Sequence, residues 1–493
     1  METEKSSTEL KVPLSPRFEE NIAYLKEELS VGESFDIIYR ALEYGGVKMG
    51  LFFVDGFAKD DVMVQIMHHL DAYASDQLLP NTLEQLMRRF IPYIEVSTTD
   101  DLEKVIAQVL SGQAALVVEG EQEAILLDVR AYPARSPEEP DMERVVRGPR
   151  DGFVETIIFN TALIRRRIRD RNLVMKYKQV GFRSKTDVVL AYMKDIADPD
   201  LVELLENKLD EIKVDGITMA EKTIEEFIFG RYLNPYPLVR FTERGDTAAV
   251  HLLEGHVLII VDGSPSVLIC PTTFWHHLQH AEEYRQKPIV GAFLRWVRFT
   301  AIFISLFVLP LWYVLATNPH LLPERWSFIG VEKTGNISLF WQFFLAEIGT
   351  EILRMAAIHT PNALATALGL VAAVLIGEVA VQVGLFSHEV ILYLAIAVTG
   401  TYATPSYELS LANRIFRLLF LVAGALFGLY GFLLAVLGWF LLLATTKTLT
   451  IPYLWPLVPF HGKSLLEVLV RTPIPLMKKE APILKVNKKK KGA

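Results

Sequence analysis

GQAALVVEGEQEAILLD, residues 112–128, has a counterpart further along the chain in GHVLIIVDGSPSVLICP, residues 255–271. In each stretch a glycine precedes a short apolar run, an acidic residue and a glycine follow it, and a second apolar run comes next. Two short apolar runs around an acidic-Gly pair are typical of a β-hairpin. We therefore predict two hairpins, which turn at Gly120 and Gly263.

A second match lies upstream at nearly the same spacing. Asp55 and Asp60 correspond to Asp195 and Asp200 at one constant offset, and short apolar strands alternate with amphipathic helices around them. Two matches at nearly one spacing indicate an internal duplication. The sequence thus predicts two related α/β subdomains, residues 35–130 and 151–288, after a polar N-terminal segment over residues 1–34.

A Pro-rich connector over residues 131–150 separates the two predicted subdomains. The helix that follows it ends in a basic cluster, and two interpretations of that cluster stay open. Cations near a helix C-terminus complement the helix dipole. The same cluster could instead form an interface with an acidic neighbouring chain or with lipid headgroups. The arginines concerned are Arg165, Arg166, Arg167 and Arg169.

Composition divides the chain into a soluble and a membrane part. Mean hydropathy is +0.27, yet 22% of the 493 residues are charged. We expect no cleavable signal peptide, because the N-terminus has no apolar core. Cys270 is the only cysteine, which excludes an intrachain disulfide and a zinc site of several cysteines. Without a Walker A loop, a nucleophile elbow or a zinc-binding HExxH motif, we expect no enzyme, no cofactor and no metal site.

The last third predicts a helical membrane domain over residues 289–460 and a basic tail over residues 461–493. Basic residues before the first span and in the tail place both on the cytoplasmic side by the positive-inside rule. Residues 337–355 are expected to form an amphipathic or re-entrant helix that does not cross, or a helix that lines a water-filled path. The four predicted spans are residues 292–316, 363–384, 389–404 and 415–444.

Two groups of side chains stand out in this domain. Carboxylates on membrane helices normally face protein or water, which makes the polar residues pore candidates. Small residues at four-residue intervals let helices approach closely. The polar candidates are Glu347, Glu351, Arg354, Glu378 and Gln382, and the helix-packing candidates are Gly369, Ala373, Gly377, Gly424 and Gly428.

Several long motifs resemble one family, the A subunits of the GerA-type spore germinant receptors. They are EEPDMERVVRGPRDGFVETIIFNTALIRRRIRD, GFRSKTDVVLAY, NPYPLVRFTER, LLEGHVLIIVDGSPSVLICPTTF and TPSYELSLANRIFRLL. The resemblance extends from about residue 20 to residue 459.

The resemblance implies a germination protein of the spore inner membrane that assembles with itself, as a pentamer, into a cation channel. Its expected partners are further copies of the chain, other membrane proteins of the germination machinery, membrane lipids and permeant monovalent cations. Nucleic acid is not expected, because the net charge is -8. The alternative function is a non-conducting scaffold that organises receptor or channel partners.

Overall fold

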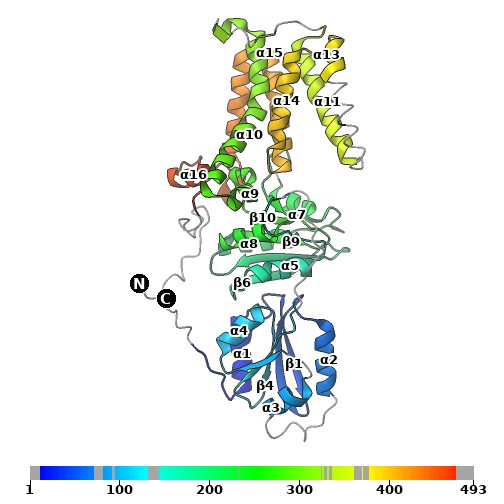
Figure 1. Ribbon diagram of the computed structural model, residues 1–493, viewed down its shortest axis with the longest axis vertical. Helices are drawn as coiled ribbons and strands as arrows, with labels where there is room; N and C mark the ends of the chain where they lie inside the picture. The colour runs from blue at the N-terminus through cyan, green and yellow to red at the C-terminus, as the bar shows by residue number, and fades with distance from the viewer. Residues whose placement is uncertain are drawn as a thin grey trace. The chain divides into compact units, whose positions relative to one another are not determined.

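The structure is a computed structural model, and its chain forms two compact units (Figure 1). The first unit contains the chain up to Gly230 together with Phe241–Pro271, and the second contains Arg231–Arg240 and Thr272–Met477. The residues described are 11–71, 82–91, 95–130, 143, 145–230, 232–323, 325–326, 330–331, 336–359, 369 and 377–473. Most of the predicted connector, the end of the basic tail and Ala373 lie outside them.

The first unit holds two copies of one arrangement, which we call the first repeat (residues 11–130) and the second repeat (residues 145–271). In the first repeat an antiparallel sheet has the strand order β1-β2-β4-β5-β3. Its elements are α1 (Phe18–Glu28), β1 (Ile37–Tyr44), β2 (Val47–Val54), α2 (Asp60–Asp71), α3 (Thr82–Gln85), η2 (Leu86–Phe90), β3 (Val96–Thr99), α4 (Leu102–Leu110), β4 (Ala114–Val118) and β5 (Ala124–Leu127).

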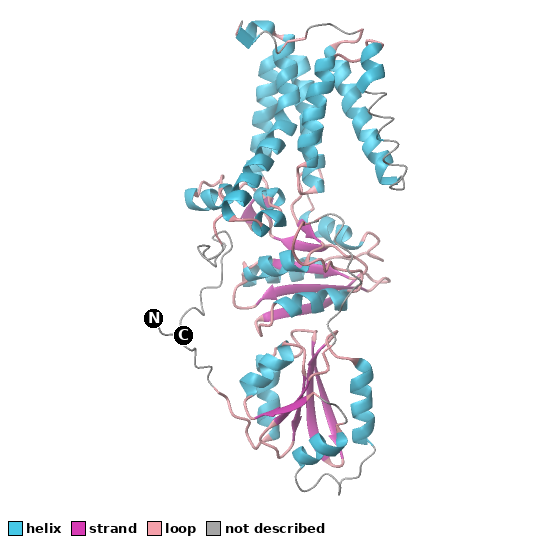
Figure 2. Cartoon of the chain, in the orientation of Figure 1, coloured by secondary structure: helices cyan, strands magenta, loops and turns pink. Residues whose placement is uncertain are grey.

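The second repeat has a sheet with the strand order β6-β7-β9-β10-β8, which is the same order with each strand replaced by its counterpart. Figure 2 shows the two sheets with their helices. The elements are α5 (Ile157–Arg167), β6 (Leu173–Val180), β7 (Thr186–Met193), α6 (Pro199–Asp210), α7 (Ala220–Phe229), β8 (Arg240–Thr242), α8 (Gly245–Leu253), β9 (Val257–Val261) and β10 (Val267–Cys270).

Both predicted hairpins are confirmed. Strand β4 pairs with β5, and β9 pairs with β10, both antiparallel. The turn glycines Gly120 and Gly263 have φ values of +82° and +85°. The glycines that precede each hairpin, Gly112 and Gly255, have φ values of 102° and 97°. Side chains other than glycine rarely adopt such conformations, so the four glycines fix the same backbone path in both repeats.

In both repeats a buried asparagine of the first helix forms hydrogen bonds with the chain segment that precedes the helix. Asn21 accepts a hydrogen bond from the Ser15 amide at 2.8 Å and donates one to the Ser15 carbonyl at 2.7 Å. Asn160 makes the same two bonds with Val154, at 2.8 and 2.6 Å. Both asparagines are buried. Each asparagine therefore satisfies two backbone groups that the sheet does not reach.

Two predicted domain boundaries are wrong. Helix α1 was expected in a separate polar segment, but Ile22 and Leu25 are buried in the core of the first repeat. The second subdomain was predicted to reach residue 288, but the chain enters the second unit at Thr272. The amphipathic face of α1 decides the first boundary, because a helix buries its apolar stripe against the nearest sheet.

The second unit is a helical bundle. Among its described residues, two helices are long and apolar enough to cross a membrane, and they are α10 and α15. The predicted span 292–316 lies inside α10. The elements are η3 (Phe274–Leu278), α9 (Ala281–Arg285), α10 (Pro288–Thr317), η4 (Pro319–Leu321), α11 (Leu339–His359), α13 (Ala380–Gln382), α14 (His388–Tyr402), α15 (Tyr407–Thr445), β11 (Lys447–Thr448), β12 (Ile451–Pro452) and α16 (Gly462–Leu469).

The prediction of one tilted span over residues 415–444 is wrong, because α15 is interrupted at Gly428. There φ is 59° and ψ is -144°, outside the helical region, and essentially only glycine adopts this conformation. The helix turns back on itself, so that Phe420 contacts Phe432 and Trp439 at ring-centroid distances of 6.0 and 6.4 Å. We call residues 407–427 the first arm and residues 429–445 the second arm.

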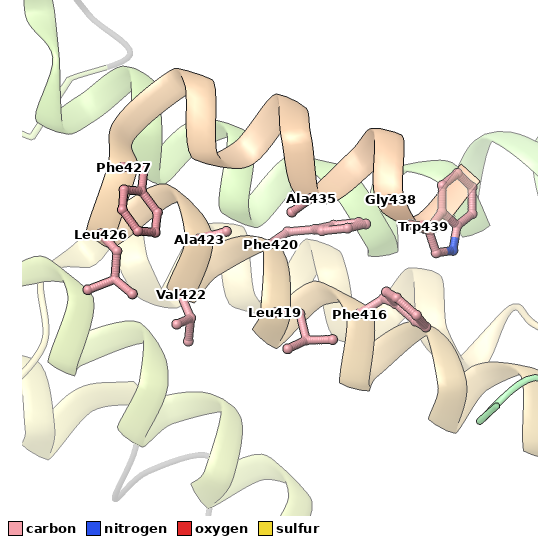
Figure 3. A pocket seen from close by; sticks show the side chains of 10 residues that line it. All are labelled: Phe416, Leu419, Phe420, Val422, Ala423, Leu426, Phe427, Ala435, Gly438 and Trp439. Atoms are coloured by element: carbon pink, nitrogen blue, oxygen red, sulfur yellow. The ribbon is translucent and has the colours of Figure 1, made fainter. Parts of the chain in front are cut away.

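An apolar groove of 380 Å³ lies along the two arms of α15 (Figure 3). Phe416 and Phe420 line it from the first arm, and Ala435 and Trp439 line it from the second arm. Residues so far apart in sequence meet there only because the arms are antiparallel.

Helix α11, expected to be amphipathic or re-entrant or to line a water-filled path, packs beside α14. Near its start Phe343 contacts Trp312 of α10 with ring centroids 5.4 Å apart. Near its end Arg354 is hydrogen-bonded to Tyr407, where the first arm of α15 begins. The helix therefore extends from one end of the bundle towards the other.

Candidate functional site

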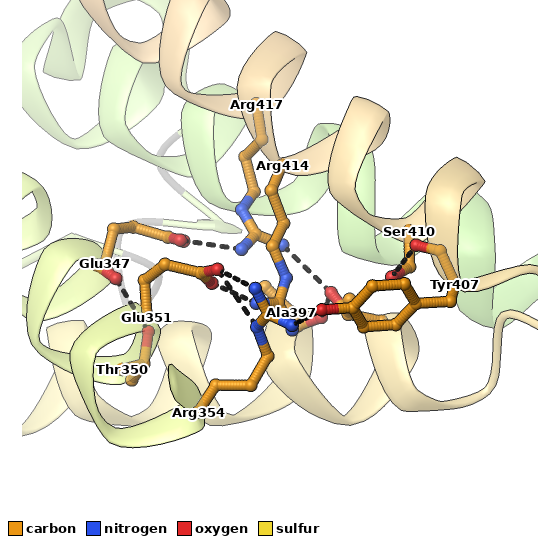
Figure 4. A network of polar contacts seen from close by, with 10 residues as sticks. Glu347, Thr350, Glu351, Arg354, Ala397, Tyr407, Ser410, Arg414 and Arg417 are labelled. Atoms are coloured by element: carbon orange, nitrogen blue, oxygen red, sulfur yellow. Dashed lines mark hydrogen bonds and ion pairs between the residues drawn. The ribbon is translucent and has the colours of Figure 1, made fainter. Parts of the chain in front are cut away.

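A network of charged side chains lies inside the bundle, between α11 and the first arm of α15 (Figure 4). Helix α11 presents Glu347, Glu351 and Arg354 on one side, as their helical spacing predicts. The first arm presents Arg414 and Arg417, which are three residues apart and so lie on the same side of that helix.

Glu347 and Arg417 form the buried part of this network. Arg417 Nη2 donates to Glu347 Oε2 at 2.7 Å, and the two side chains are only 2% and 4% exposed. Arg417 Nη1 also donates to the Ser305 carbonyl of α10 at 2.9 Å and to Thr401 Oγ1 of α14 at 3.3 Å. One arginine therefore connects four helices, and its charge is balanced within the chain.

Glu351 lies one turn further along α11 and holds two arginines. Arg354 Nε donates to its Oε1 at 2.9 Å, and Arg414 binds its other oxygen. Arg354 also bonds to the Tyr407 hydroxyl and lies 5.2 Å from the centroid of that ring. A guanidinium over an aromatic face is an attractive arrangement. Tyr407 thus positions the outer end of the network.

The network has an electrostatic consequence for the pore prediction. Two carboxylates face three guanidinium groups, so the cluster carries no net negative charge. Glu347 Oε1 is nevertheless buried with no hydrogen-bond partner among the described residues. Buried polar atoms in native proteins are usually satisfied by protein or by ordered water. Water access to this oxygen would meet that requirement.

Glu378 and Gln382 lie apart from this network. Gln382 Nε2 donates to Glu378 Oε1 at 3.2 Å, because residues four apart lie on one helix face. Both side chains are exposed on the single chain. The structure therefore does not bring the five polar candidates together, because three lie in the network and two lie on the bundle surface.

The small residues predicted to pack helices also have different environments. At Gly424 an added Cβ would lie 2.7 Å from Val314 Cγ2, so this glycine lets α10 approach the first arm. Gly428 was predicted to pack helices, but it forms the turn of α15 instead. At Gly369 and Gly377 an added Cβ would meet no atom within 4 Å. Packing of these two glycines against another helix stays a prediction.

The basic cluster of α5 has several environments. Arg165 is buried and pairs with Asp36 of the first repeat, with Nε donating to Oδ2 at 2.8 Å. Arg167 pairs with Asp151 at 2.6 Å. Arg166 and Arg169 are exposed. Arg165 therefore joins the two repeats, while an interface role for the exposed arginines stays a prediction.

Sequence reasoning missed Arg417 and Arg414 as site residues. A signal was present, because two arginines at helical spacing enter an apolar stretch long enough for a span. An arginine inside such a stretch requires an acidic or carbonyl partner. Glu347 and Glu351 are about one helical turn apart, as Arg414 and Arg417 are. Ion pairs between these two carboxylates and these two arginines could therefore have been proposed from the sequence.

Comparison with known proteins identifies the family of the chain. The model of the Bacillus/Clostridium GerA spore germination protein family matches residues 23–483. The chain belongs to this family. With its apolar helices, the chain is a membrane protein of spore germination or sporulation.

Relatives match over nearly the whole chain. Stage V sporulation protein AF of Bacillus subtilis is 51% identical over 455 residues, covering 92% of each chain. The uncharacterized membrane protein YfkQ of the same organism is 30% identical, covering 94% of this chain and 90% of its own. The N-terminal domain of the A subunit of the Bacillus megaterium spore germinant receptor GerK3 is similar at 25% identity and a TM-score of 0.41. That match covers 54% of this chain and 98% of that one.

Proposed function

We propose that this chain is the membrane subunit of a spore germination complex in which several copies form a cation-conducting channel, in the inner membrane of the spore. The observation that carries the proposal is the exposed pair Glu378 and Gln382. A carboxylate on a membrane helix is costly when it faces lipid. A ring of copies gives it a water-filled path to face, where repeated carboxylates attract cations.

Contacts at the two ends of the bundle support an even number of membrane crossings. The entry end holds Phe274, whose amide donates to the Tyr453 carbonyl at 2.8 Å. The distal end holds Asn336, whose amide donates to the Gly384 carbonyl at 3.0 Å. The chain enters the unit and leaves α15 at the entry end, which agrees with an N-terminal region and a tail on the same, cytoplasmic side.

The crossings follow from the helices that run between these ends. Helix α10 leaves the entry end, and α11 returns towards that end beside α14. Helix α14 is antiparallel to α10, because Tyr393 stacks on Trp312 while Gly400 packs against Ala301. The two arms of α15 leave and return again. Apart from Gly369, residues 360–376, which connect α11 to α13 and hold most of the predicted span 363–384, lie outside the described residues.

The test is potassium flux through liposomes that contain the purified full chain. Glu378→Gln removes one charge per copy at nearly constant shape, and we expect a lower potassium-to-chloride selectivity. Glu467→Gln, which changes an exposed carboxylate of α16 beside the start of α10, is the matched control. A wild-type chain that passes no potassium would contradict conduction. Unchanged selectivity in Glu378→Gln would remove Glu378 from the path.

The internal balance of charge at Glu347 and Glu351 favours the second candidate function, a non-conducting scaffold. A scaffold needs a rigid bundle rather than a charged path, and buried ion pairs can fix one packing arrangement. It predicts that Glu378→Gln spores germinate normally and that liposomes show no potassium flux. Flux that depends on Glu378 would exclude it.

A further inference from the structure

The second repeat has an apolar surface that the first repeat lacks. Among the described residues of the first repeat, Val64 is the only large hydrophobic side chain that is exposed. The second repeat exposes several on its helices, and its fold is the same. The first repeat therefore serves as an internal control for what this fold needs on its surface. The exposed large hydrophobic side chains on the helices of the second repeat include Phe159, Phe227, Val250 and Leu253.

Corresponding positions make the difference specific. Phe159 precedes the buried Asn160, and Glu20 precedes the buried Asn21 in the first repeat. Val250 lies five residues before Gly255, and Ala107 lies five residues before Gly112. Phe159 and Val250 are 45% and 52% exposed. Glutamate and alanine serve the same outward positions in the first repeat, so neither aromatic nor branched side chains are required there for folding.

The exposed side chains lie on two opposite faces of the second sheet. Helices α5 and α8 cover one face, where they share a core with Met175, Val189 and Ile260. Strand residues alternate between faces. On the opposite face, Lys176 of β6 reaches Glu206 of α6 at 2.7 Å. Phe159, Val250 and Leu253 thus mark the α5/α8 face, and Phe227 of α7 marks the α6/α7 face.

The two faces are complementary in charge. Helix α5 ends in three arginines, of which Arg166 is exposed and lies on the same side as Phe159. Helices α6 and α7 together carry seven carboxylates and two lysines. Their exposed carboxylates include Glu226, beside Phe227. In the first repeat the position of Arg166 is occupied by Glu27. A basic apolar face and an acidic apolar face on one subdomain fit each other on two copies.

We propose that the α5/α8 face of one chain binds the α6/α7 face of the next chain. The inference rests on the self-assembly in the proposed function, and it names the surface and the occupant. Contact between two different faces is heterologous, and a heterologous contact that closes on itself generates a ring. Phe159, Val250 and Leu253 supply the apolar centre, and Arg166 faces the acidic helices at the rim. Charge pairs at such a rim select the partner more than they strengthen binding.

Cross-linking between the two faces tests the proposal on the full chain in detergent. Val250→Cys and Phe227→Cys are combined in one chain and treated with a bis-maleimide. The native Cys270 is fully buried, which raises the pKa of its thiol to about 12 and keeps it out of the reaction. We expect a ladder of covalent multimers. Each single cysteine variant should give none, because a heterologous contact does not bring two copies of one face together.

The matched control places cysteines at Ala107 and Val64 of the first repeat, and it should give no ladder. Dimers from Val250→Cys alone would overturn the proposal in favour of a symmetric contact. If the double cysteine variant keeps the mass of the oligomer but gives no ladder, the two faces do not form the contact, although the chain still assembles with itself. A monomeric mass without cross-links would overturn both, and cross-links to a different protein would show that another partner occupies the face.

Discussion

The two repeats of the soluble unit share their interior and differ at their surface. Both use a buried asparagine to hold the chain before the first helix, and both use glycines with positive φ around the last hairpin. Yet Glu20 and Glu27 in one correspond to Phe159 and Arg166 in the other. The shared residues are those that the backbone conformation requires, whereas the residues at outward positions can vary without changing the fold. The proposed contact between copies accounts for this difference, because it uses the surface of the second repeat and not that of the first.

The largest expected effect comes from separating the repeats. Arg165→Met leaves Asp36 buried without its bidentate partner, whose Nε and Nη2 bond at 2.8 and 3.2 Å. Removing one partner of a buried ion pair costs about 3–5 kcal/mol. We expect faster amide hydrogen exchange around residues 34–36 and 173–175. The double variant Arg165→Met/Asp36→Leu should recover most of the protection, and equal exchange in the single and double variants would contradict this role.

The asparagine pair should have a smaller and equal effect in the two repeats. Asn21→Leu and Asn160→Leu each leave an amide and a carbonyl without a partner, at a cost of about 1–3 kcal/mol per group. Hydrogen exchange at the Ser15 and Val154 amides measures the loss. Asn207→Ala, on the exposed side of α6, is the control and should have little effect. A large loss in only one repeat would show that the two asparagines are not equivalent.

The smallest effect is expected at the rim of the proposed contact. Arg166→Glu places a carboxylate opposite the acidic helices, and exposed charge pairs contribute about 0.2–1 kcal/mol. We expect a modest shift of the assembly towards smaller species in mass photometry, and a return when Glu226→Arg is added. Glu27→Arg changes the corresponding position of the first repeat and should leave assembly unchanged. Failure of the second charge reversal to restore assembly would argue against this pairing.

Local features of the fold were predictable from the sequence, and non-local ones were not. The acidic-Gly pairs identify both hairpins because a tight turn demands a residue that tolerates positive φ. The strand order places β4 between β2 and β5, and it depends on tertiary pairing that no local pattern records. The interruption of α15 at Gly428 was also not predictable from the sequence. Four glycines lie along that helix, and the sequence does not distinguish the one at the turn from those that pack.

The same limit applies to the candidate site. Glu347, Glu351 and Arg354 follow helical spacing, which is enough to place them on one side of α11. Their partners Arg414 and Arg417 lie more than sixty residues away in the sequence. Periodicity relates neighbours within one helix, so it cannot show which helix supplies the opposite charge. More could have been predicted from the sequence by comparing the two repeats position by position, because that comparison identifies Phe159 and Arg166 as unusual.

Self-assembly through the second repeat is most directly tested by the mass of the detergent-solubilised full chain. The wild type should have a mass that is a multiple of the 55.7 kDa chain. Phe159→Ser/Val250→Ser should shift the distribution towards single chains, while Glu20→Ser/Ala107→Ser at the corresponding positions of the first repeat should not. A wild-type chain that remains at 55.7 kDa would contradict the account.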